Sequence, residues 1–120
     1  MDIRRIDPGA YLSSAVVAGD FVYLAGLVAD DLNTDVAGQT GQILKKIDRY
    51  LQEAGSDKSR IVQTQIWLRD IAKWGEMNEV WKGWVDKQNP PARARRGAHG
   101  RRAHPRRDHG DRHPQVTSIA

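Results

Sequence analysis

The eight residues IVQTQIWL, at positions 61–68, have the alternation of a β-strand with one apolar face. Successive side chains of a strand point to opposite sides of the sheet, so every second residue shares a face. One face would carry Val62, Thr64, Ile66 and Leu68, and the other would carry Gln63 and Gln65. A strand with one apolar and one polar face is typical of a sheet that is covered on one side only. The flanking segments predict what covers it.

The segment before this strand is predicted to be a helix from Val36 to Ala54. Its apolar residues recur at intervals of three and four, which places them on one helical face. These residues are Ile43, Leu44, Ile47, Tyr50 and Leu51, while Lys45, Lys46, Asp48, Arg49 and Gln52 face away. Gly55 is well placed to end this helix, because glycine readily adopts the left-handed backbone found just after a helix C-terminus.

The segment after the strand is predicted to be a second helix from Ile71 to Lys87, with Asp70 at its start. Its apolar stripe consists of Trp74, Met77, Trp81, Trp84 and Val85. Helical spacing alone accounts for the three Trp, so packing against the sheet is favoured over a ligand-binding box. A polar, proline-terminated connection over residues 88–91 follows, and a further strand is expected after it.

The N-terminal part is predicted to be a hairpin preceded by a short strand. Residues 15–18 (AVVA) and 21–25 (FVYLA) are rich in β-forming residues, and the pair Gly19-Asp20 between them is typical of tight hairpin turns. Residues 3–6 would form the first strand, which the turn-forming residues 7–9 (DPG) end. The predicted fold class is therefore α+β, with a mainly antiparallel sheet and two helices on one of its faces.

Length and composition allow one small domain and exclude several kinds of protein. The chain has 120 residues, enough for a single domain that would gain stability from oligomerisation. It has no Cys, which excludes disulfides, thiolate metal sites and thiol nucleophiles and favours a reducing compartment. No apolar stretch is long enough to span a membrane, and the N-terminus does not resemble a signal peptide. We therefore expect a cytoplasmic protein that does not bind membranes.

The composition changes abruptly at residue 95. Residues 95–114 hold seven Arg, four His, three Gly, two Pro and only two acidic residues, whereas the rest of the chain is close to neutral. Such a segment has no large apolar side chain to bury, so it is not expected to form a core strand, and only residues 115–120 regain strand character. We divide the chain into a folded domain, residues 1–94, and an aberrant segment, residues 95–120, in which the C-terminal strands are lost or replaced. Our hypothesis is that this segment is translated out of frame.

Two other interpretations of the Arg/His-rich segment are weaker. Seven Arg would bind phosphates in a salt-dependent and sequence-independent way. The segment has no aromatic residue for base stacking and no motif of a known nucleic-acid reader, so nucleic-acid binding is disfavoured. The four His are His99, His104, His109 and His113, and their spacing without Cys or Glu neighbours does not indicate a metal site. No metal ion or other cofactor is therefore expected.

Five short motifs occur in the order and spacing of a known family. They are FVYLAG at 21–26, the helix from Gln39 to Gly55, IWLRD at 66–70, MNEVW at 77–81 and PPARA at 90–94. Together they resemble the RidA (YjgF-type) family over about residues 3–94. The resemblance implies a chorismate-mutase-like α+β fold that assembles as a homotrimer, with ligand clefts between neighbouring subunits. It also implies hydrolysis of reactive enamines and imines, released by pyridoxal-phosphate enzymes, to 2-keto acids and ammonia, without a cofactor or metal. Some members instead act in pyrimidine breakdown, or as translation inhibitors with ribonuclease activity.

The resemblance also implies four site residues. Arg93 matches the family arginine that grips the substrate carboxylate, a task for which a guanidinium presents a fixed fork of donors. Asn78 matches a family Asn near the cleft, Tyr11 corresponds to a cleft Tyr, and Gly26 fits a close approach of backbone to ligand. Structural roles stay open for each: a strand-start Arg bridging a surface acid, a solvated helix position, a turn-packing Tyr and a strand end. Arg93 is expected to be catalytic as well as substrate-binding.

Three departures from the family pattern bear on activity. Ala25 stands where the family often has Ser, and Arg95 stands where many members have Cys. The family's last strand carries a Glu that helps to position the attacking water, but no Glu follows Glu79 in this chain. Whether the chain is an enzyme therefore stays open. It would hydrolyse imines in RidA fashion at an impaired rate, or bind a small carboxylate-bearing metabolite without turnover; nucleic-acid binding or ribonuclease activity ranks below both.

Overall fold

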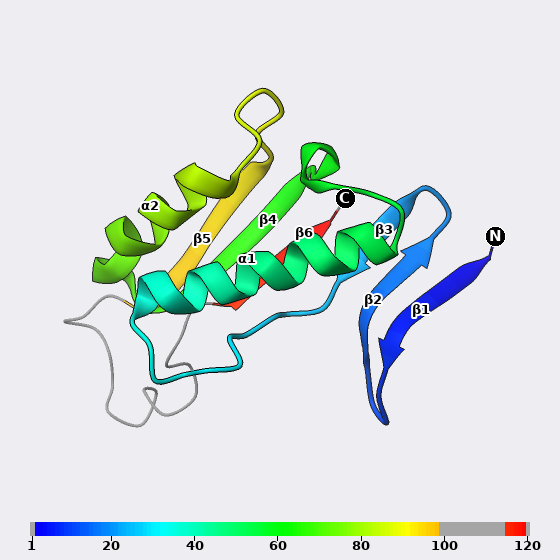
Figure 1. Ribbon diagram of the computed structural model, residues 1–120, viewed down its shortest axis with the longest axis horizontal. Helices are drawn as coiled ribbons and strands as arrows, with labels where there is room; N and C mark the ends of the chain where they lie inside the picture. Colours follow the sequence, from blue (N-terminus) through cyan, green and yellow to red (C-terminus); the bar gives the residue numbers. More distant parts are fainter. Residues whose placement is uncertain (1, 99–114, 120) are drawn as a thin grey trace.

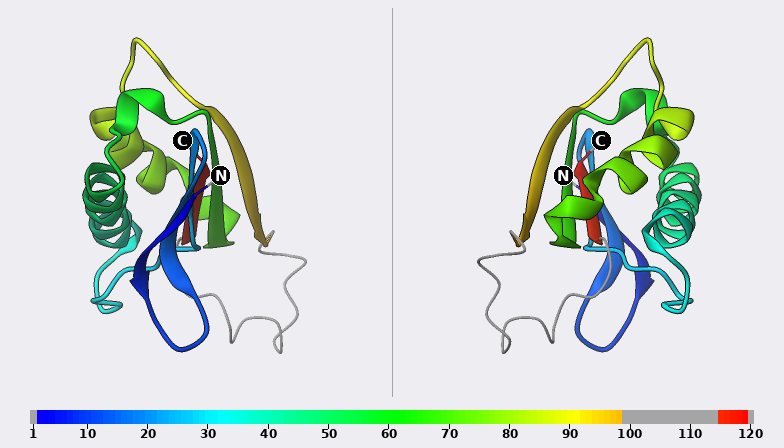
Figure 2. Two further views of the ribbon diagram at one scale, coloured as in Figure 1. Left: turned by 90° about the vertical axis from the view of Figure 1, so that its right-hand side faces the viewer. Right: turned by 90° about the vertical axis from the view of Figure 1, so that its left-hand side faces the viewer.

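The computed structural model describes residues 2–98 and 115–119, and Figure 1 shows how its elements are arranged. The strands are β1 (Ile3–Pro8), β2 (Ser13–Ala18), β3 (Phe21–Leu24), β4 (Gln63–Asp70), β5 (Ala92–Ala98) and β6 (Gln115–Ile119). The helices are α1 (Val36–Glu53), α2 (Trp74–Trp84) and the short 3-10 helices Lys58–Arg60 and Ile71–Lys73. The strands form one sheet, and α1 and α2 both cover the same face of it (Figure 2). The predicted α+β fold class is confirmed.

The order of strands in the sheet is β1-β2-β3-β6-β4-β5. Every neighbouring pair is antiparallel except β4 and β5, which are parallel, so the prediction of a mainly antiparallel sheet is confirmed. The predicted hairpin consists of β2 and β3, which pair on either side of a turn where Gly19 has a positive φ of 59°. β6 lies between β3 and β4 and, among the described strands, joins the β1-β2-β3 part of the sheet to the β4-β5 part.

The core lies between the sheet and the two helices and uses most of the predicted apolar positions. The buried residues of the predicted helical stripes are Ile43, Leu44, Ile47, Tyr50 and Leu51 in α1, and Met77 and Trp81 in α2. Trp74, Trp84 and Val85 are partly buried against the same core. The predicted apolar face of β4 is confirmed for Thr64, Ile66 and Leu68, which are all buried. Val62 is 55 % exposed, contrary to the prediction, because it precedes the strand and does not share its alternation.

Specific capping bonds set both ends of α1. At its start, Asp35 Oδ1 accepts a hydrogen bond from the Gly38 amide at 2.8 Å, which satisfies a donor that the helix itself cannot. At its end, Gly55 has a positive φ of 81°, as predicted from its position. The amide of Ser56 then donates to the carbonyl of Leu51 at 2.7 Å, which completes a Schellman-type helix end.

The second helix is shorter than predicted. Asp70 starts the element as expected, but it caps a 3-10 turn that precedes α2. The helix was predicted to run to Lys87 and instead ends at Trp84. The physical reason is a local turn at Asp86, whose Oδ1 accepts a hydrogen bond from the amide of Gln88 at 3.0 Å and so competes with helical continuation.

Replacing Gly55 with Ala is expected to destabilise the fold by about 1 kcal/mol, because L-residues disfavour its left-handed backbone. A new Cβ would have room there, so the cost would come from the backbone alone. Gly41→Ala is the matched control, since Gly41 lies inside α1 with open space around it and this change should stabilise the fold by about 0.5–1 kcal/mol. Urea denaturation of both variants measures the difference, and effects of the same sign would contradict the prediction.

β5 continues through Ala98, so the expectation that the strand pattern fails after Ala94 is wrong for residues 95–98. These residues form an edge strand, which obtains its hydrogen bonds from the backbone of β4 and needs no large apolar side chain. Gly97 suits this place, because a Cβ there would lie 2.7 Å from the carbonyl oxygen of Leu68. β6 also forms, where strand character was expected. The expected loss of the C-terminal strands is therefore corrected.

The rest of the Arg/His-rich segment, residues 99–114, lies outside the described residues, and so do its four His. The division of the chain after Ala94 falls inside β5 and stays a prediction, as does the hypothesis of out-of-frame translation. That hypothesis concerns the gene, and resequencing across the codons for residues 92–97 tests it. A confirmed, unbroken reading frame would overturn it.

Candidate functional site

Arg93, the residue predicted to grip a carboxylate, lies near the start of the edge strand β5, with its guanidinium against α2. Its Nη1 donates a hydrogen bond to Asn78 Oδ1 at 2.8 Å. Its guanidinium carbon lies 4.9 Å from the ring centroid of Trp74 and 5.2 Å from that of Trp81. The structure therefore brings together two of the predicted site residues, Arg93 and Asn78, and adds two aromatic rings to them.

One face of α2 builds this arrangement. Trp74, Asn78 and Trp81 are separated by four and three residues, a spacing that puts them on one side of a helix. Trp81 is buried and Trp74 is partly buried against the core, so packing fixes the positions of both rings. A guanidinium has five N–H donors, and the bond to Asn78 uses one of them. The guanidinium is thus oriented and keeps donors for a planar anion such as a carboxylate.

Arg95 adds a second positive charge beside Arg93. It follows Arg93 by two residues along β5, and its guanidinium carbon lies 5.3 Å from the ring centroid of Trp74. Arg93 is exposed, but partial desolvation of its guanidinium lowers its pKa below the usual value, and the charge of Arg95 lowers that pKa further. Arg93 still carries its charge at any ordinary pH. Among residues 2–98 and 115–119, the ion pairs involve other cations, so no described carboxylate neutralises either arginine.

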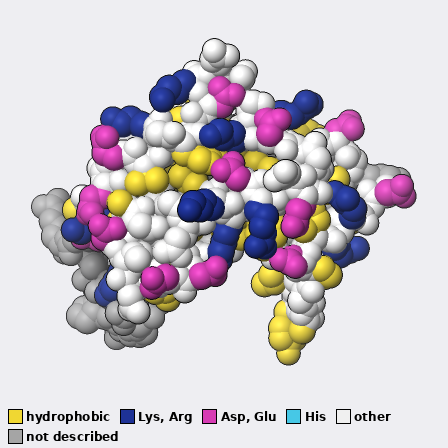
Figure 3. Space-filling view, in the orientation of Figure 1, with side chains coloured by type: hydrophobic (Ala, Val, Ile, Leu, Met, Phe, Trp, Pro, Cys, Tyr) yellow, Lys and Arg dark blue, Asp and Glu magenta, His cyan; other side chains and the backbone are white. Residues whose placement is uncertain are grey.

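The other two predicted site residues do not meet Arg93 within one chain. Tyr11 lies in the turn between β1 and β2, at the opposite edge of the sheet from β5, and is 98 % exposed. Gly26 follows β3, which β6 and β4 separate from β5. Figure 1 shows the β1–β2 hairpin extending beyond the helices, and Figure 3 shows that its tip is apolar. The roles of Tyr11 and Gly26 in a site stay predictions.

The sequence did not identify three residues of the site around Arg93, two Trp and one Arg. It assigned Trp74 and Trp81 to sheet packing alone, but both rings also contact the guanidinium of Arg93. It treated Arg95 only as a departure from the family pattern and not as a neighbour of Trp74. The four-residue spacing between Trp74 and Asn78 was the signal that could have found the aromatic rings, because Asn78 was already a candidate.

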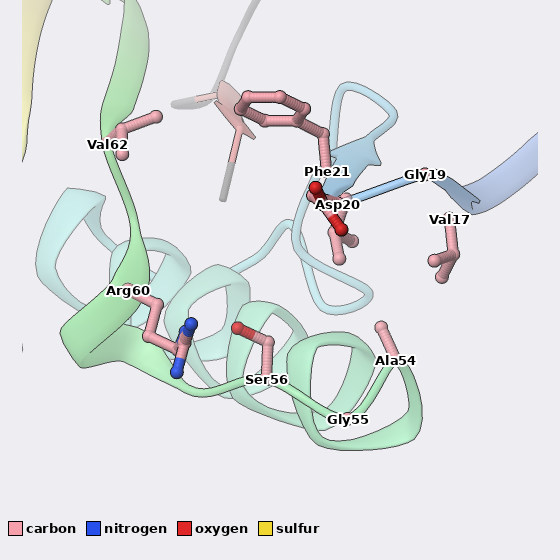
Figure 4. Close-up of a pocket in the computed structure, with 10 residues that line it drawn as sticks. Val17, Gly19, Asp20, Phe21, Ala54, Gly55, Ser56, Arg60 and Val62 are labelled. Atoms are coloured by element: carbon pink, nitrogen blue, oxygen red, sulfur yellow. The ribbon is translucent and has the colours of Figure 1, made fainter.

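Two pockets of the structure lie away from Arg93. One, of about 440 Å³, opens between the β2–β3 turn and the end of α1, and Figure 4 shows Asp20 and Phe21 on one side of it and Ser56 and Arg60 on the other. The second, of about 270 Å³, is lined by Asp30, Gln42, Lys45, Lys46 and Arg49. Ion pairs with Asp side chains occupy two of its three cations. Neither pocket contains a residue that the sequence predicts to be functional.

No helix or strand among the described residues covers the sheet face opposite α1 and α2 (Figure 2), which leaves an open sheet face in this part of the chain. Alternation along β3 and β4 points Phe21, Tyr23 and Trp67 to this face, because the residues next to them are buried on the helix side. These three aromatic residues are between 39 % and 50 % exposed. Large apolar side chains on one exposed face are typical of a surface that contacts another protein chain.

The described part of the chain offers neither a metal-binding cluster nor a membrane-spanning helix. It contains no group of three or more His, Cys, Asp or Glu that could hold a metal ion. None of its helices is both long and apolar enough to cross a membrane. The expected cytoplasmic location and the expected absence of a cofactor stay predictions.

A sheet of this order, covered on one face by two helices, defines the class of the protein as a YjgF-type α+β fold. The solved structure of a YjgF family member from Neisseria meningitidis matches with a TM-score of 0.84 and 36 % sequence identity, and the match covers 100 % of this chain and 94 % of that one. Yeast Mmf1 also matches with a TM-score of 0.84, but at 20 % identity this likeness shows the fold alone.

Sequence relatives then show the family. The family model described as Endoribonuclease L-PSP matches residues 2–100. A RutC family protein of Haemophilus ducreyi is 39 % identical over 92 residues, which cover 77 % of this chain and 79 % of that protein. The 2-iminobutanoate/2-iminopropanoate deaminase of Rattus norvegicus is 35 % identical over 92 residues, which cover 72 % of this chain and 66 % of that protein. The chain belongs to the RidA (YjgF) family, as the resemblance predicted.

Proposed function

We propose that this protein binds 2-imino and 2-enamino acids by their carboxylate and hydrolyses them to 2-keto acids and ammonia. The observation that carries the proposal is the guanidinium of Arg93, which Asn78 and two Trp rings hold at a sheet edge with donors left for a ligand. A carboxylate paired side by side with an arginine is fixed in both position and plane. The imine carbon next to it is then held in one orientation for attack by water. The deaminase name of the rat relative agrees with this reaction.

Hydrolysis of an imine requires few catalytic groups from the protein. An enamine first gains a proton at its β-carbon and loses one from its nitrogen, which gives the imine. Water adds to the carbon of the C=N bond, and a proton moves from the added water to the nitrogen. The hydroxyl proton of this adduct then moves to the nitrogen and the C–N bond breaks, which releases ammonia as the C=O bond of the 2-keto acid forms. Because imines hydrolyse in water without a catalyst, a substrate oriented by Arg93 and a water molecule positioned beside its imine carbon would raise the rate.

We further propose that a second copy of the chain completes the site within a homotrimer. Tyr11 is exposed at the opposite edge of the sheet from Arg93, so it would reach such a site only from a neighbouring copy. The open sheet face with Phe21, Tyr23 and Trp67 offers an apolar surface for contact between copies. Light scattering measures the mass in solution, and a monomer across the working concentration range would contradict this assembly.

A second candidate function is carboxylate binding without turnover, and one specific observation favours it. No Glu follows Glu79, so the water-positioning Glu of the family has no counterpart. The side chains that contact the guanidinium of Arg93 or share its Trp74 ring include Asn78, Trp81 and Arg95, and none of these accepts a proton as a general base. Such a protein would bind 2-keto acids and leave imines to decay in bulk water. Ribonuclease activity is not proposed, because no observation on the described residues favours it.

The test is to generate the enamine from serine or threonine with a dehydratase and to follow its decay with increasing amounts of the protein. We expect the decay rate to rise in proportion to protein concentration, and we expect 2-oxobutyrate to bind when measured by calorimetry. Unchanged decay together with 2-oxobutyrate binding would support the second candidate in place of the first. A protein that neither accelerates the decay nor binds 2-oxobutyrate would overturn both.

A further inference from the structure

Arg93 and Arg95 form a pair of guanidiniums on one face of β5. Residues two apart in a strand point to the same side of the sheet, and their Cα atoms lie roughly 6.6 Å apart. Both guanidinium carbons lie near the ring of the same residue, Trp74, at 4.9 Å and 5.3 Å from its centroid. One aromatic ring therefore contacts two cations, which puts both of them on the α2 side of the edge strand.

The two charges have no described counter-charge. The ion pairs within residues 2–98 and 115–119 involve other cations, and the hydrogen bond of Arg93 goes to a neutral amide, that of Asn78. The charge of Arg95 contributes to the lowered pKa of Arg93, after the effect of burial, so the guanidiniums repel each other. An anion that contacts both would relieve this repulsion and gain charge-assisted hydrogen bonds from each.

We infer that this site selects dianionic ligands, which place one carboxylate on Arg93 and a second carboxylate on Arg95. The ligand class is the 2-imino and 2-keto acids that derive from amino acids with an acidic side chain. The inference rests on the proposed carboxylate grip of Arg93 and adds Arg95 as the residue that determines specificity. A second carboxylate is favoured over a free phosphate, because the proposed function already puts the carboxylate of a 2-imino or 2-keto acid on Arg93 and Arg95 lies beside it.

The chain itself supplies a matched control for this inference. Arg96 is the next residue after Arg95 in β5 and carries the same charge. Alternation along the strand points it to the other face of the sheet, away from Trp74. Removing the charge of Arg96 changes the net charge of the protein by the same amount as removing that of Arg95, so the two variants separate a local contact from a general electrostatic effect.

Isothermal titration calorimetry at low salt compares 2-oxoglutarate, 2-oxobutyrate and inorganic phosphate as ligands of the full chain. We expect 2-oxoglutarate to bind about tenfold more tightly than 2-oxobutyrate, which is the gain from one additional charge-assisted pair. Arg95→Gln should remove this preference, because it should weaken the binding of 2-oxoglutarate about tenfold more than the binding of 2-oxobutyrate. Arg95→Lys should keep part of the preference, and Arg96→Gln should change neither affinity. Circular dichroism verifies that each variant is folded as the wild type is.

Equal affinities of the wild type for the two keto acids would overturn the inference. An Arg95→Gln protein that keeps the preference would overturn it as well, and so would phosphate that binds more tightly than 2-oxoglutarate. In each of these cases, 2-oxobutyrate binding that Arg93→Gln weakens would leave the proposed function standing. A wild type that binds neither keto acid would overturn the carboxylate grip of Arg93 and the dianion selection together.

Discussion

Arg93→Gln is expected to lower the affinity for 2-oxobutyrate roughly 10- to 100-fold, as the loss of a charge-assisted pair predicts. The same factor is expected in kcat/KM for imine hydrolysis, because the carboxylate is bound in the transition state as well. Gln is neutral and cannot offer two parallel donors to a carboxylate. Arg93→Lys keeps the charge but loses the planar fork, so its affinity should lie between those of the wild type and Arg93→Gln.

Asn78→Ala tests how much the orientation of Arg93 contributes to carboxylate binding, because this change leaves the charge of Arg93 in place. The guanidinium would keep its charge and its two Trp neighbours but lose the hydrogen bond to Oδ1. We expect a smaller loss of affinity, about fivefold, in line with one hydrogen bond. Calorimetry with 2-oxobutyrate measures the whole series, with Arg96→Gln as the control that leaves the affinity unchanged. Full affinity in Arg93→Gln would show that carboxylates bind elsewhere.

Leu51→Ala is expected to lower the free energy of unfolding by about 2–5 kcal/mol and Tm by roughly 8–20 °C. Leu51 has no exposed surface and lies in the core between α1 and the sheet, so the truncated side chain leaves a cavity that the packed surroundings fill only in part. Leu32→Ala makes the same chemical change at a side chain that is 49 % exposed, and should cost less than about 1 kcal/mol.

Urea and thermal unfolding of the two Leu variants measure this difference. Protein concentration has to be equal in all samples, because assembly of copies raises Tm with concentration. A Leu51→Ala protein as stable as Leu32→Ala would mean that α1 does not pack on the sheet as described.

Local periodicity made α1 predictable. An amphipathic helix repeats every 3.6 residues, so its buried stripe can be identified without knowing what covers it. Ile43, Ile47 and Leu51 are buried where that repeat puts them. Gly55 was predictable for a related reason, since the left-handed φ is needed at the residue that follows the helix. The place of Arg93 near Asn78 followed from the family resemblance and not from any local pattern.

The features that the sequence did not predict depend mostly on contacts between residues that are distant in sequence. Whether residues 95–98 form a strand depends on the backbone of β4 beside them, which supplies hydrogen bonds whatever the side chains are. The separation of Tyr11 from Arg93 depends on the order of the strands, in which β6 is inserted between β3 and β4. The early end of α2 depends on a competing hydrogen bond at Asp86, which helical periodicity does not register.

The position of β6 has a consequence for the synthesis of this protein. β3 and β4 leave the ribosome before the strand that joins them. Tyr23 pairs with Val16 on one side but has no partner on its other side until Ile119 has been made. Until then each of these two strands carries one row of unpaired backbone N–H and C=O groups, on which another nascent chain can add. Pairing over such a long sequence separation is also slow. Self-association of growing chains therefore competes with folding, and it competes best where many ribosomes translate one message.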